Sequence, residues 1–223
     1  MSSKLYPTTK FERSLGSARY IIGLDEVGRG AIAGPVAVGA FVVDLHNLDD
    51  SKIPEKLQDS KLMTERNREA VYEVLSIWEP GYAVGFIEAE QIDRNGIVWS
   101  LAQAAVKALQ QLNENPVLRE AIGSGEVHLL LDGTHNWLDS VVSRIPVTVR
   151  AKADRDCFAV SAAACLAKVT RDRHMVSLAD SYRNYGLEGH KGYASATHIE
   201  ALRKYGPTQI HRVSWLTKIL SGE

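Results

Sequence analysis

Short apolar runs of strand length recur along the chain and predict a β-sheet. The segment GAIAGP (30–35) between the first two runs holds the turn residues Gly and Pro, so these two runs are predicted to form an antiparallel hairpin. The second run is rich in valine, which is typical of a buried strand. The five predicted strands cover residues 20–26, 35–43, 82–88, 126–133 and the beginning of 146–154.

Helical spacing of apolar residues appears between and after these runs. Thr64 is placed to cap a helix, and residues 66–78 are amphipathic. The alanine-rich segment 157–182 has small residues on several sides, as expected of a buried helix. Two further helices are predicted, a long one at 89–112 that is weakened at Gly96 and a short one at 195–206 that begins at Ser195 and ends at Gly206.

The order of these elements is β-β-α-β-α-β-β-α, followed by a small helical tail. This order predicts one α/β fold with a mixed sheet. The polar residues 1–19 lack the apolar core of a signal peptide and are expected to form a short flexible lead-in. No apolar run approaches the roughly 20 residues that span a bilayer, so no membrane association is expected.

Composition agrees with a globular protein. The 223 residues suffice for one well-buried core, with or without a small appendage, and 45% of them are hydrophobic and 24% charged. The only two cysteines, Cys157 and Cys165, lie eight residues apart in one predicted helix, too few for a disulfide scaffold or a zinc site. A reducing cytoplasm is therefore the expected location.

Charge is distributed unevenly, although the net charge is only −1. Residues 44–93 hold five bases and twelve acids, so 5 − 12 = −7. Residues 144–173 hold seven bases and three acids, and residues 183–218 six and two, so each segment carries +4. A basic C-terminal half is expected where one face meets a polyanion, and solvated helix faces are the alternative.

Acidic residues stand at the ends of predicted strands or in the following loops, where α/β proteins build their sites. They are Asp25 with Glu26, Asp132 and Asp154. Adjacent side chains on a regular strand face opposite ways, so a bend, which the following glycines would permit, is needed to bring Asp25 and Glu26 into one site. Taken singly, Asp154 could instead cap a helix, Asp132 could serve a turn, and Glu26 could be a solvated residue.

Four carboxylates at one site need a compensating charge, because neighbouring like charges raise each other's pKa. Oxygen ligands alone select a hard ion such as Mg²⁺ or Mn²⁺. Two such ions about 4 Å apart promote in-line displacement at phosphorus, one generating hydroxide and the other stabilising the leaving oxygen. The four acids alone are compatible with any acidic metal site.

The residues around the four acids indicate which kind of metal site this is. The stretch DEVGRG (25–30), followed by AGP, resembles the signature of the type 2 ribonucleases H, the ribonuclease HII family. The resemblance extends in order over nearly the whole chain, from Tyr20 to Trp215. Its further motifs are DSKLMTERNRE (59–69), IDRNGI (92–97), LLLDG (129–133), KAD (152–154), AKVTRD (167–172) and HKGYASATHIEALRKYGPTQIHR (190–212).

The resemblance implies a ribonuclease H-like fold with a catalytic domain at 20–182 and a C-terminal helical substrate-binding region at 183–223. It assigns metal binding to Asp25, Glu26, Asp132 and Asp154, with two Mg²⁺ or Mn²⁺ ions during catalysis. One departure is Cys165, where the family often has a small hydroxyl residue; this affects a phosphate or helix contact and not the metal site.

The resemblance also assigns substrate-binding residues. Gly28, Arg29 and Gly30 match the element that reads the ribonucleotide, Tyr193 the tyrosine that stacks on the sugar, and Lys61 a lysine near the scissile phosphate. Glycine lets the backbone come close to a ribose hydroxyl, and the fork of arginine suits a phosphate. The plainer alternatives are a tight turn, a packing aromatic residue and a solvated lysine.

Three further bases on the predicted helix 157–182 have two interpretations. Lys168, Arg171 and Arg173 either contact the backbone of a nucleic-acid duplex or form only the polar face of the helix.

The implied function is an endoribonuclease that cuts the RNA strand of RNA–DNA hybrids and cuts 5′ of single ribonucleotides embedded in duplex DNA. Its products carry 3′-OH and 5′-phosphate ends, and the enzyme is expected to act as a monomer. The alternatives are another two-metal nuclease of the same fold, a non-catalytic nucleic-acid-binding module, and a metal-dependent phosphatase, which leaves the basic C-terminal half unexplained.

Overall fold

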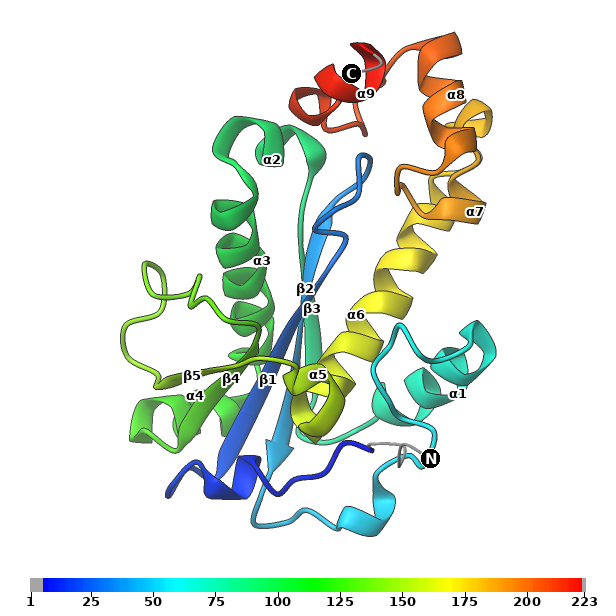
Figure 1. Ribbon diagram of the computed structural model, residues 1–223. Helices are drawn as coiled ribbons and strands as arrows, with labels where there is room; N and C mark the ends of the chain where they lie inside the picture. The colour runs from blue at the N-terminus through cyan, green and yellow to red at the C-terminus, as the bar shows by residue number, and fades with distance from the viewer. Residues whose placement is uncertain (1–5, 222–223) are drawn as a thin grey trace.

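A five-stranded mixed sheet forms the centre of the computed structural model, which describes residues 6–221 (Figure 1). The strand order is β3-β2-β1-β4-β5; β1 pairs antiparallel with β2 and parallel with β4. The mixed sheet and the hairpin predicted from the sequence are therefore confirmed. The strands are β1 (Tyr20–Val27), β2 (Val36–Asp44), β3 (Tyr82–Ile87), β4 (Val127–Asp132) and β5 (Val147–Arg150).

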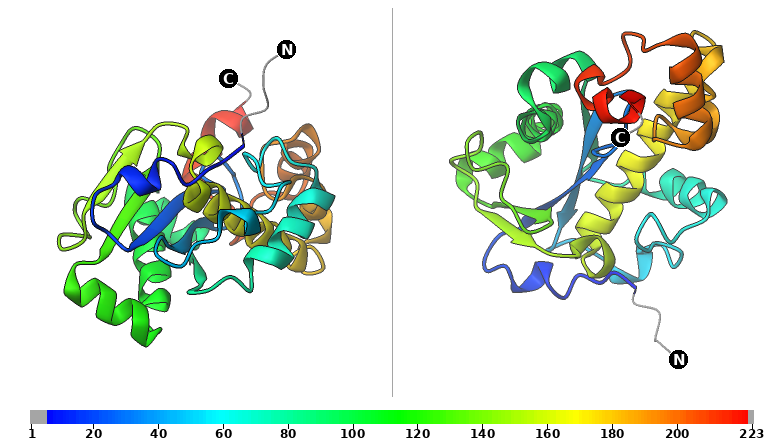
Figure 2. Two further views of the ribbon diagram at one scale, coloured as in Figure 1. Left: turned by 90° about the horizontal axis from the view of Figure 1, so that it is seen from below. Right: turned by 45° about the horizontal axis from the view of Figure 1, so that its top comes forward.

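Helices cover both faces of the sheet (Figures 1 and 2). One face packs against α2 (Ala89–Asn95), α3 (Ile97–Leu112) and α4 (Pro116–Ser124), and the other against α1 (Glu65–Leu75), α5 (Ala153–Asp156) and α6 (Phe158–Ser177). Strand β1 is buried on both faces. Its Ile22 and Leu24 join the core under α3, whereas Ile21 joins the core under α6, because successive side chains alternate between the faces.

Two glycines let α6 lie unusually close to the sheet. A Cβ atom added to Gly23 of β1 would come within 2.2 Å of the Ala159 carbonyl carbon. A Cβ atom added to Gly39 of β2 would come within 2.5 Å of the Ala163 carbonyl oxygen. Small alanine side chains on α6 therefore face glycines in the strands. The small size of these residues on both sides lets the helix approach the sheet closely.

The C-terminal helices gather at one end of the sheet, beyond the end of α6 (Figure 1). They surround a small apolar cluster that includes Ile32 from the loop after β1, Met175 from α6, and Leu202 and Leu216. The boundary expected at residue 182 stays a prediction, and residues 222–223 lie outside the described residues. The elements are η3 (Arg183–Tyr185), α7 (Leu187–His190), α8 (Ala196–Tyr205), η4 (Val213–Trp215) and α9 (Thr217–Ser221).

The predicted helices 66–78 and 157–182 end earlier than expected, at Leu75 and Ser177, and two larger differences affect the region between residues 89 and 125. The predicted helix 89–112 is divided at Gly96, whose φ of 82° is incompatible with a continuous helix. Helix α4 was not predicted, although its signals are present: Asn115 accepts from the Val117 N–H, Pro116 occupies the first turn, and Gly125 ends the helix in the left-handed region. The caps predicted at Thr64 and Ser195 are both observed.

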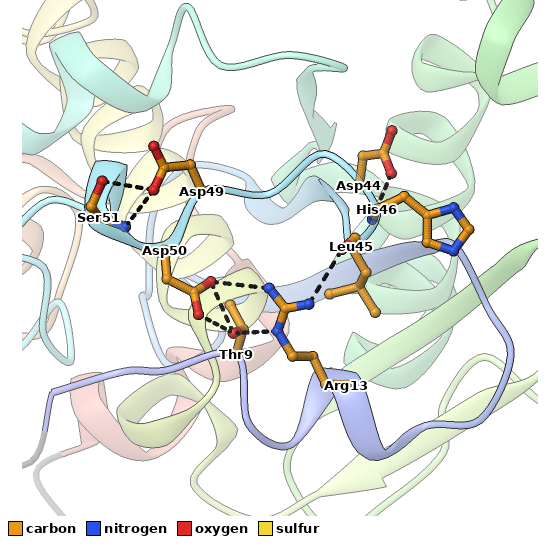
Figure 3. Close-up of polar contacts among 8 residues, drawn as sticks. All are labelled: Thr9, Arg13, Asp44, Leu45, His46, Asp49, Asp50 and Ser51. Carbon is orange, nitrogen blue, oxygen red and sulfur yellow. Dashed lines mark hydrogen bonds and ion pairs between the residues drawn. The ribbon is translucent and has the colours of Figure 1, made fainter.

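Residues 6–19 are bound to the body of the protein, where the sequence analysis expects a flexible lead-in. Thr8 pairs with Cys157, and the side chains of Thr9 and Arg13 both donate to the Asp50 carboxylate (Figure 3). Glu12 is buried and accepts the Ala159 N–H at 2.9 Å. Residues 1–5 of the expected lead-in lie outside the described residues.

Both cysteines are free and buried, which agrees with the expectation that they form no disulfide. Burial raises the pKa of the Cys165 thiol to about 12 and raises that of Cys157 as well, so neither is a reactive thiolate at neutral pH. Within residues 6–221, no helix has the length and apolar character required to cross a membrane.

Glu12 is a buried carboxyl group close to the first turn of α6. Its pKa is raised from 4.5 to about 7, mainly by burial and also by the charge of Asp156, against the lowering effect of the hydrogen bond from Ala159. One of its oxygens, Oε2, has no hydrogen-bond partner among the described residues. The native state therefore favours protonated Glu12, and this preference stabilises the fold below about pH 4.5 and is lost as the pH rises through 7.

We expect Glu12→Gln to make the protein more stable at pH 8 by about 1–2 kcal/mol, because glutamine keeps the acceptor for Ala159 without a buried charge. Urea unfolding at pH 5 and pH 8 measures this difference, and the gain should shrink at pH 5. The exposed Glu114→Gln is the matched control. An equal effect of Glu12→Gln at both pH values would contradict the assignment.

Candidate active site

Asp25 and Asp132 lie near the carboxyl ends of the neighbouring parallel strands β1 and β4, on the same edge of the sheet. In the register of β1 with β4, Leu24 lies opposite Leu131, and each acid is the next residue. Asp25 is on the strand face that contacts α6, two residues after Gly23, and only 7% of its surface is exposed. The two acids thus come together because parallel strands direct their carboxyl ends to one edge.

Asp154 reaches the same edge from the turn that follows β5. Its backbone N–H donates to Oδ1 of Asp132 at 3.4 Å. Lys152, with φ 62°, precedes α5 and turns the chain sharply. Asp154 therefore lies inside α5, and the N-cap of the following helix α6 is Cys157, so Asp154 does not cap that helix.

Glu26 follows Asp25 without the bend that the sequence analysis expects. Strand β1 runs on through Val27, and both acids keep regular partners in β2, Gly39 for Asp25 and Val38 for Glu26. Glu26 nevertheless lies at the end of the strand, where it and Asp25 border one pocket. Arg29 forms an ion pair with Glu26, with Nη1 3.3 Å from Oε1.

One pocket of about 530 Å³ joins most of the residues that the sequence singles out. It lies between the end of β1, the loop around residue 60, α6 and the turn before α8. Asp132 and Asp154 are not part of its lining, but Lys61 links it to them, since Lys61 Nζ is 3.6 Å from Asp154 Oδ2. The lining comprises Asp25, Glu26, Val27, Gly28, Arg29, Gly30, Ser60, Lys61, Ala164, Lys168 and Tyr193.

Burial and neighbouring acids raise the proton affinity of Asp25 and Asp154. Burial raises the pKa of Asp25 well above its usual value, and the charges of Glu26, Asp132 and Asp154 raise it further. Burial and Asp132 likewise raise the pKa of Asp154. Partial burial lowers the pKa of Lys61, but the field of the surrounding acids outweighs this and raises it overall. The edge of the sheet therefore carries an excess of negative charge that one lysine only partly offsets.

The donor set fits a hard divalent cation, because it consists of carboxylate oxygens and contains no histidine or cysteine. As the side chains stand, residues 6–221 contain no group of three or more His, Cys, Asp or Glu residues arranged to hold an ion.

Gly28 and Gly30 differ in what requires glycine. Gly28 has φ 78°, and a Cβ atom there would lie 2.1 Å from Nε of the buried Arg171, so the fold itself demands glycine. A Cβ atom on Gly30 would meet nothing within 4 Å. No contact within the described chain therefore explains Gly30, whereas close approach of a ligand would.

Tyr193 lies in the turn between α7 and α8, with its ring bordering the pocket and 36% exposed. Lys168 Nζ and the Arg171 guanidinium carbon lie 5.7 and 5.6 Å from the ring centroid. Of the three α6 bases, Lys168 reaches the pocket and Arg171 is fully buried, whereas Arg173 turns away to Glu69 and Glu73 of α1.

The profile of the family described as Ribonuclease HII matches residues 22–218. The chain belongs to the ribonuclease HII family. It is therefore an enzyme, a ribonuclease H, which is an endoribonuclease of RNA–DNA hybrids. The ribonuclease HII of Streptomyces avermitilis is 42% identical over 214 residues, covering 94% of this chain and 83% of that relative.

Solved structures share the fold of this ribonuclease HII family member. The ribonuclease H2 of Pyrococcus horikoshii OT3 has a TM-score of 0.66 at 24% identity, covering 91% of this chain and 98% of that one. Bst-RNase HIII, solved in complex with Mn²⁺, has a TM-score of 0.64 at 23% identity, covering 94% and 71%. The ribonuclease H-like fold expected from the sequence is thereby confirmed.

Several residues that shape the site of this enzyme were not singled out from the sequence. Asp59 accepts the Lys61 backbone N–H at 3.0 Å and pairs with Arg155, so it orients the turn that carries Lys61. Arg212 is fully buried, although a charged residue in a polar tail gives no sign of burial. Asp59 could have been found as an Asx turn in the segment DSK.

Two hydrogen-bonded histidines, His211 and His198, connect Thr208 to the backbone carbonyl of Tyr193. The Thr208 N–H donates to His211 Nδ1, so His211 carries its proton on Nε2 and donates to His198 Nε2 at 3.1 Å. His198 must then be protonated on Nδ1 and donate to the Tyr193 carbonyl at 2.9 Å. The orientation of each ring follows from a backbone N–H at one end and a carbonyl at the other.

Both histidines must stay neutral to keep this chain. Burial, together with the neighbouring His198, lowers the pKa of His211 from 6.5 to about 4. Burial lowers the pKa of His198 as well. Their contribution to stability is thus present above about pH 6.5 and is lost as the pH falls towards 4.

We expect the wild-type free energy of unfolding to fall by about 1–3 kcal/mol between pH 7 and pH 4.5 through these histidines. His211→Gln should be less stable at pH 7 but should have a flatter profile, measured by urea unfolding at several pH values. His46→Gln, on an exposed turn, should keep the wild-type slope. Parallel profiles for wild type and His211→Gln would contradict the role of the histidine chain.

Proposed function

We propose that this ribonuclease cuts on the 5′ side of single ribonucleotides in duplex DNA, as well as in RNA–DNA hybrids, and leaves 3′-OH and 5′-phosphate ends. Asp25, Glu26, Asp132 and Asp154 would hold two Mg²⁺ or Mn²⁺ ions. The observation that carries the proposal is the single pocket in which acids, the Gly28–Gly30 turn and Tyr193 meet. The Mn²⁺ complex of Bst-RNase HIII is consistent with the choice of ion.

Selection of a ribonucleotide depends on groups that reach the 2′-OH, which can both donate and accept a hydrogen bond. The backbone at Gly30 is open on the side where a Cβ atom would stand, so a sugar can approach its N–H and C=O groups. Tyr193 provides an aromatic side chain in the lining of the same pocket. Protein groups that pair with the 2′-OH of ribose would be left without a partner when the sugar is deoxyribose. This loss would weaken the binding of DNA relative to a ribonucleotide.

Phosphate binding would involve the basic residues around the pocket. Arg29 is half exposed and needs only to leave Glu26 to reach a phosphate bidentately. Lys61 is 79% exposed and stands beside Asp154, so it can contact a phosphate next to the acids. Divalent cations bound to the four acids would supply Lewis acidity and an activated water. No protein nucleophile is required.

The first test is cleavage of duplex DNA with and without one embedded ribonucleotide, together with an RNA–DNA hybrid, in Mg²⁺, in Mn²⁺ and with a chelator. We expect cuts 5′ of the ribonucleotide and in the hybrid, none in plain DNA, and none after chelation. Equal cutting of both duplexes would favour a DNA nuclease of the same fold.

Asp132→Asn is the matched control for this assay. The variant should bind the ribonucleotide-containing duplex but lose cleavage, because one of the proposed ligands is neutralised. A wild-type protein that binds the duplex but is inert with both metals would favour a non-catalytic binding module.

The two glycines provide a second test. Gly30→Ala should unfold at the wild-type temperature, because its new methyl group meets no protein atom, but should lose about tenfold or more in cleavage at the ribonucleotide. Gly28→Ala should instead lower the unfolding temperature, since the methyl group collides with Arg171 and φ is positive. Full activity of Gly30→Ala would contradict close approach of the sugar.

The cellular role that follows is removal of misincorporated ribonucleotides and primer remnants during DNA replication and repair. We propose that the enzyme does this as a monomer in the cytoplasm.

A further inference from the structure

Two arginines behind the pocket are fully buried. Arg171 of α6 and Arg212 of the C-terminal region both have no exposed surface, and within residues 6–221 neither forms an ion pair with a carboxylate. Burial of an unpaired cation is unfavourable unless hydrogen bonds satisfy it. Every hydrogen bond that these guanidinium groups donate within the described chain ends on a backbone carbonyl oxygen.

Arg212 binds the carbonyls of the glycine-rich turn. Its Nη2 donates to the Gly28 oxygen at 2.7 Å, and its Nη1 donates to the Arg29 oxygen at 2.9 Å. Nε and Nη2 also reach the Gly34 oxygen, at 3.2 and 3.1 Å, so the fork holds both ends of the loop. One side chain thus determines which way two successive peptide groups point.

The orientation of the carbonyls decides the orientation of the amides. Across a trans peptide, the C=O of one residue and the N–H of the next point in opposite directions. The carbonyls of Gly28 and Arg29 point inward to Arg212, so the N–H groups of Arg29 and Gly30 point away from it. Within residues 6–221, neither N–H has a hydrogen-bond partner, and both residues border the pocket.

Arg171 joins this loop to the turn that carries Tyr193. It donates to the Ala33 and Pro35 carbonyls of the loop and, at 3.0 Å, to the carbonyl of Lys191. Lys191 is in the left-handed region, with φ 51°, an unusual conformation for a residue with a side chain. The backbone N–H groups of Ile32 and Ala33 both donate to the Gly192 oxygen, so backbone hydrogen bonds also connect the loop to the turn that carries Tyr193.

The guanidinium group of Arg212 keeps its charge at neutral pH. Burial and the neighbouring charge of Arg171 together lower the pKa of Arg212 to about 9. Burial also lowers the pKa of Arg171. The carbonyl dipoles around Arg212 are therefore attracted to a cation, which favours their inward orientation.

We propose that Arg171 and Arg212 are positioning residues for ribonucleotide selection. Arg212 aims the amides of Arg29 and Gly30 into the pocket, and Arg171 fixes their distance from Tyr193. The inference rests on the proposed function, because it explains how the site distinguishes ribose from deoxyribose. Neither arginine contacts the substrate in this scheme.

The test compares equilibrium binding of two duplexes that differ in one 2′-OH. Arg212→Lys and Arg171→Lys are made in the Asp132→Asn protein, which should not cleave. Fluorescence anisotropy gives the ratio of the dissociation constants for all-DNA and ribonucleotide-containing duplex. We expect each lysine variant to lower this ratio about tenfold or more, since lysine keeps the charge but lacks the planar fork. The ratio does not depend on the fraction of protein that is folded.

The matched control is Arg173→Lys, an exposed arginine two residues along α6, which should keep the parent ratio. Hydrogen exchange of residues 27–34 in the free proteins is the second measurement, and it should become faster only in the two buried-arginine variants. Parent-like ratios and exchange in both would overturn the proposal.

Two other outcomes are also decisive. If the Asp132→Asn parent itself binds both duplexes equally, the proposed function fails and this inference fails with it. If the parent discriminates but neither lysine variant folds, the arginines serve only the stability of the fold, and the proposal of a selective role is overturned.

Discussion

The close contact between α6 and the sheet is the constraint on which the rest of the structure depends. Four glycines meet successive turns of this helix: Gly23 at Ala159, Gly39 at Ala163, Gly28 at Arg171, and Gly34 at Met175. Each contact excludes a Cβ atom on the glycine. The helix can therefore run close along the length of β1 and into the loop beyond it. As a result, Asp25 is buried, and Ala164 and Lys168 become the wall of the pocket facing it.

Opposite charges are arranged in separate layers around this contact. The acids stand at the edge of the sheet, where they raise the proton affinity of Asp25, while Arg171 and Arg212 lie behind the glycine-rich loop. The carbonyls of the loop face the arginines. The amides of Arg29 and Gly30 have no partner within residues 6–221 and are left for the pocket. Backbone dipoles thus separate the two charge layers, and a polyanion can meet donors on one side of the loop and cation-binding acids on the other.

The sequence was sufficient to predict the sheet, the hairpin and the family, because strand patterns and ordered motifs are local signals. It also indicated Asp25, Asp132 and Asp154 as strand-end acids, which the fold brings to one edge. The bend expected between Asp25 and Glu26 is absent, because β1 continues through Val27 and the end of the strand alone lets both reach the pocket. The burial of Arg212 could not be predicted from the sequence, because it depends on carbonyls 178 and 184 residues away along the chain.

The N-terminal segment of the described chain has a consequence for biosynthesis. Glu12 receives its hydrogen bond from Ala159, 147 residues later, and β1 obtains its parallel partner only when β4 has been made. Long-range contacts of this kind are slow to form, because loop closure precedes any compensating interaction. A nascent chain that has emerged only as far as β3 holds Asp25 on an unfinished sheet. Residue 212 must therefore have emerged from the ribosome before the loop beside Asp25 acquires its shape, because Arg212 holds the carbonyls of that loop.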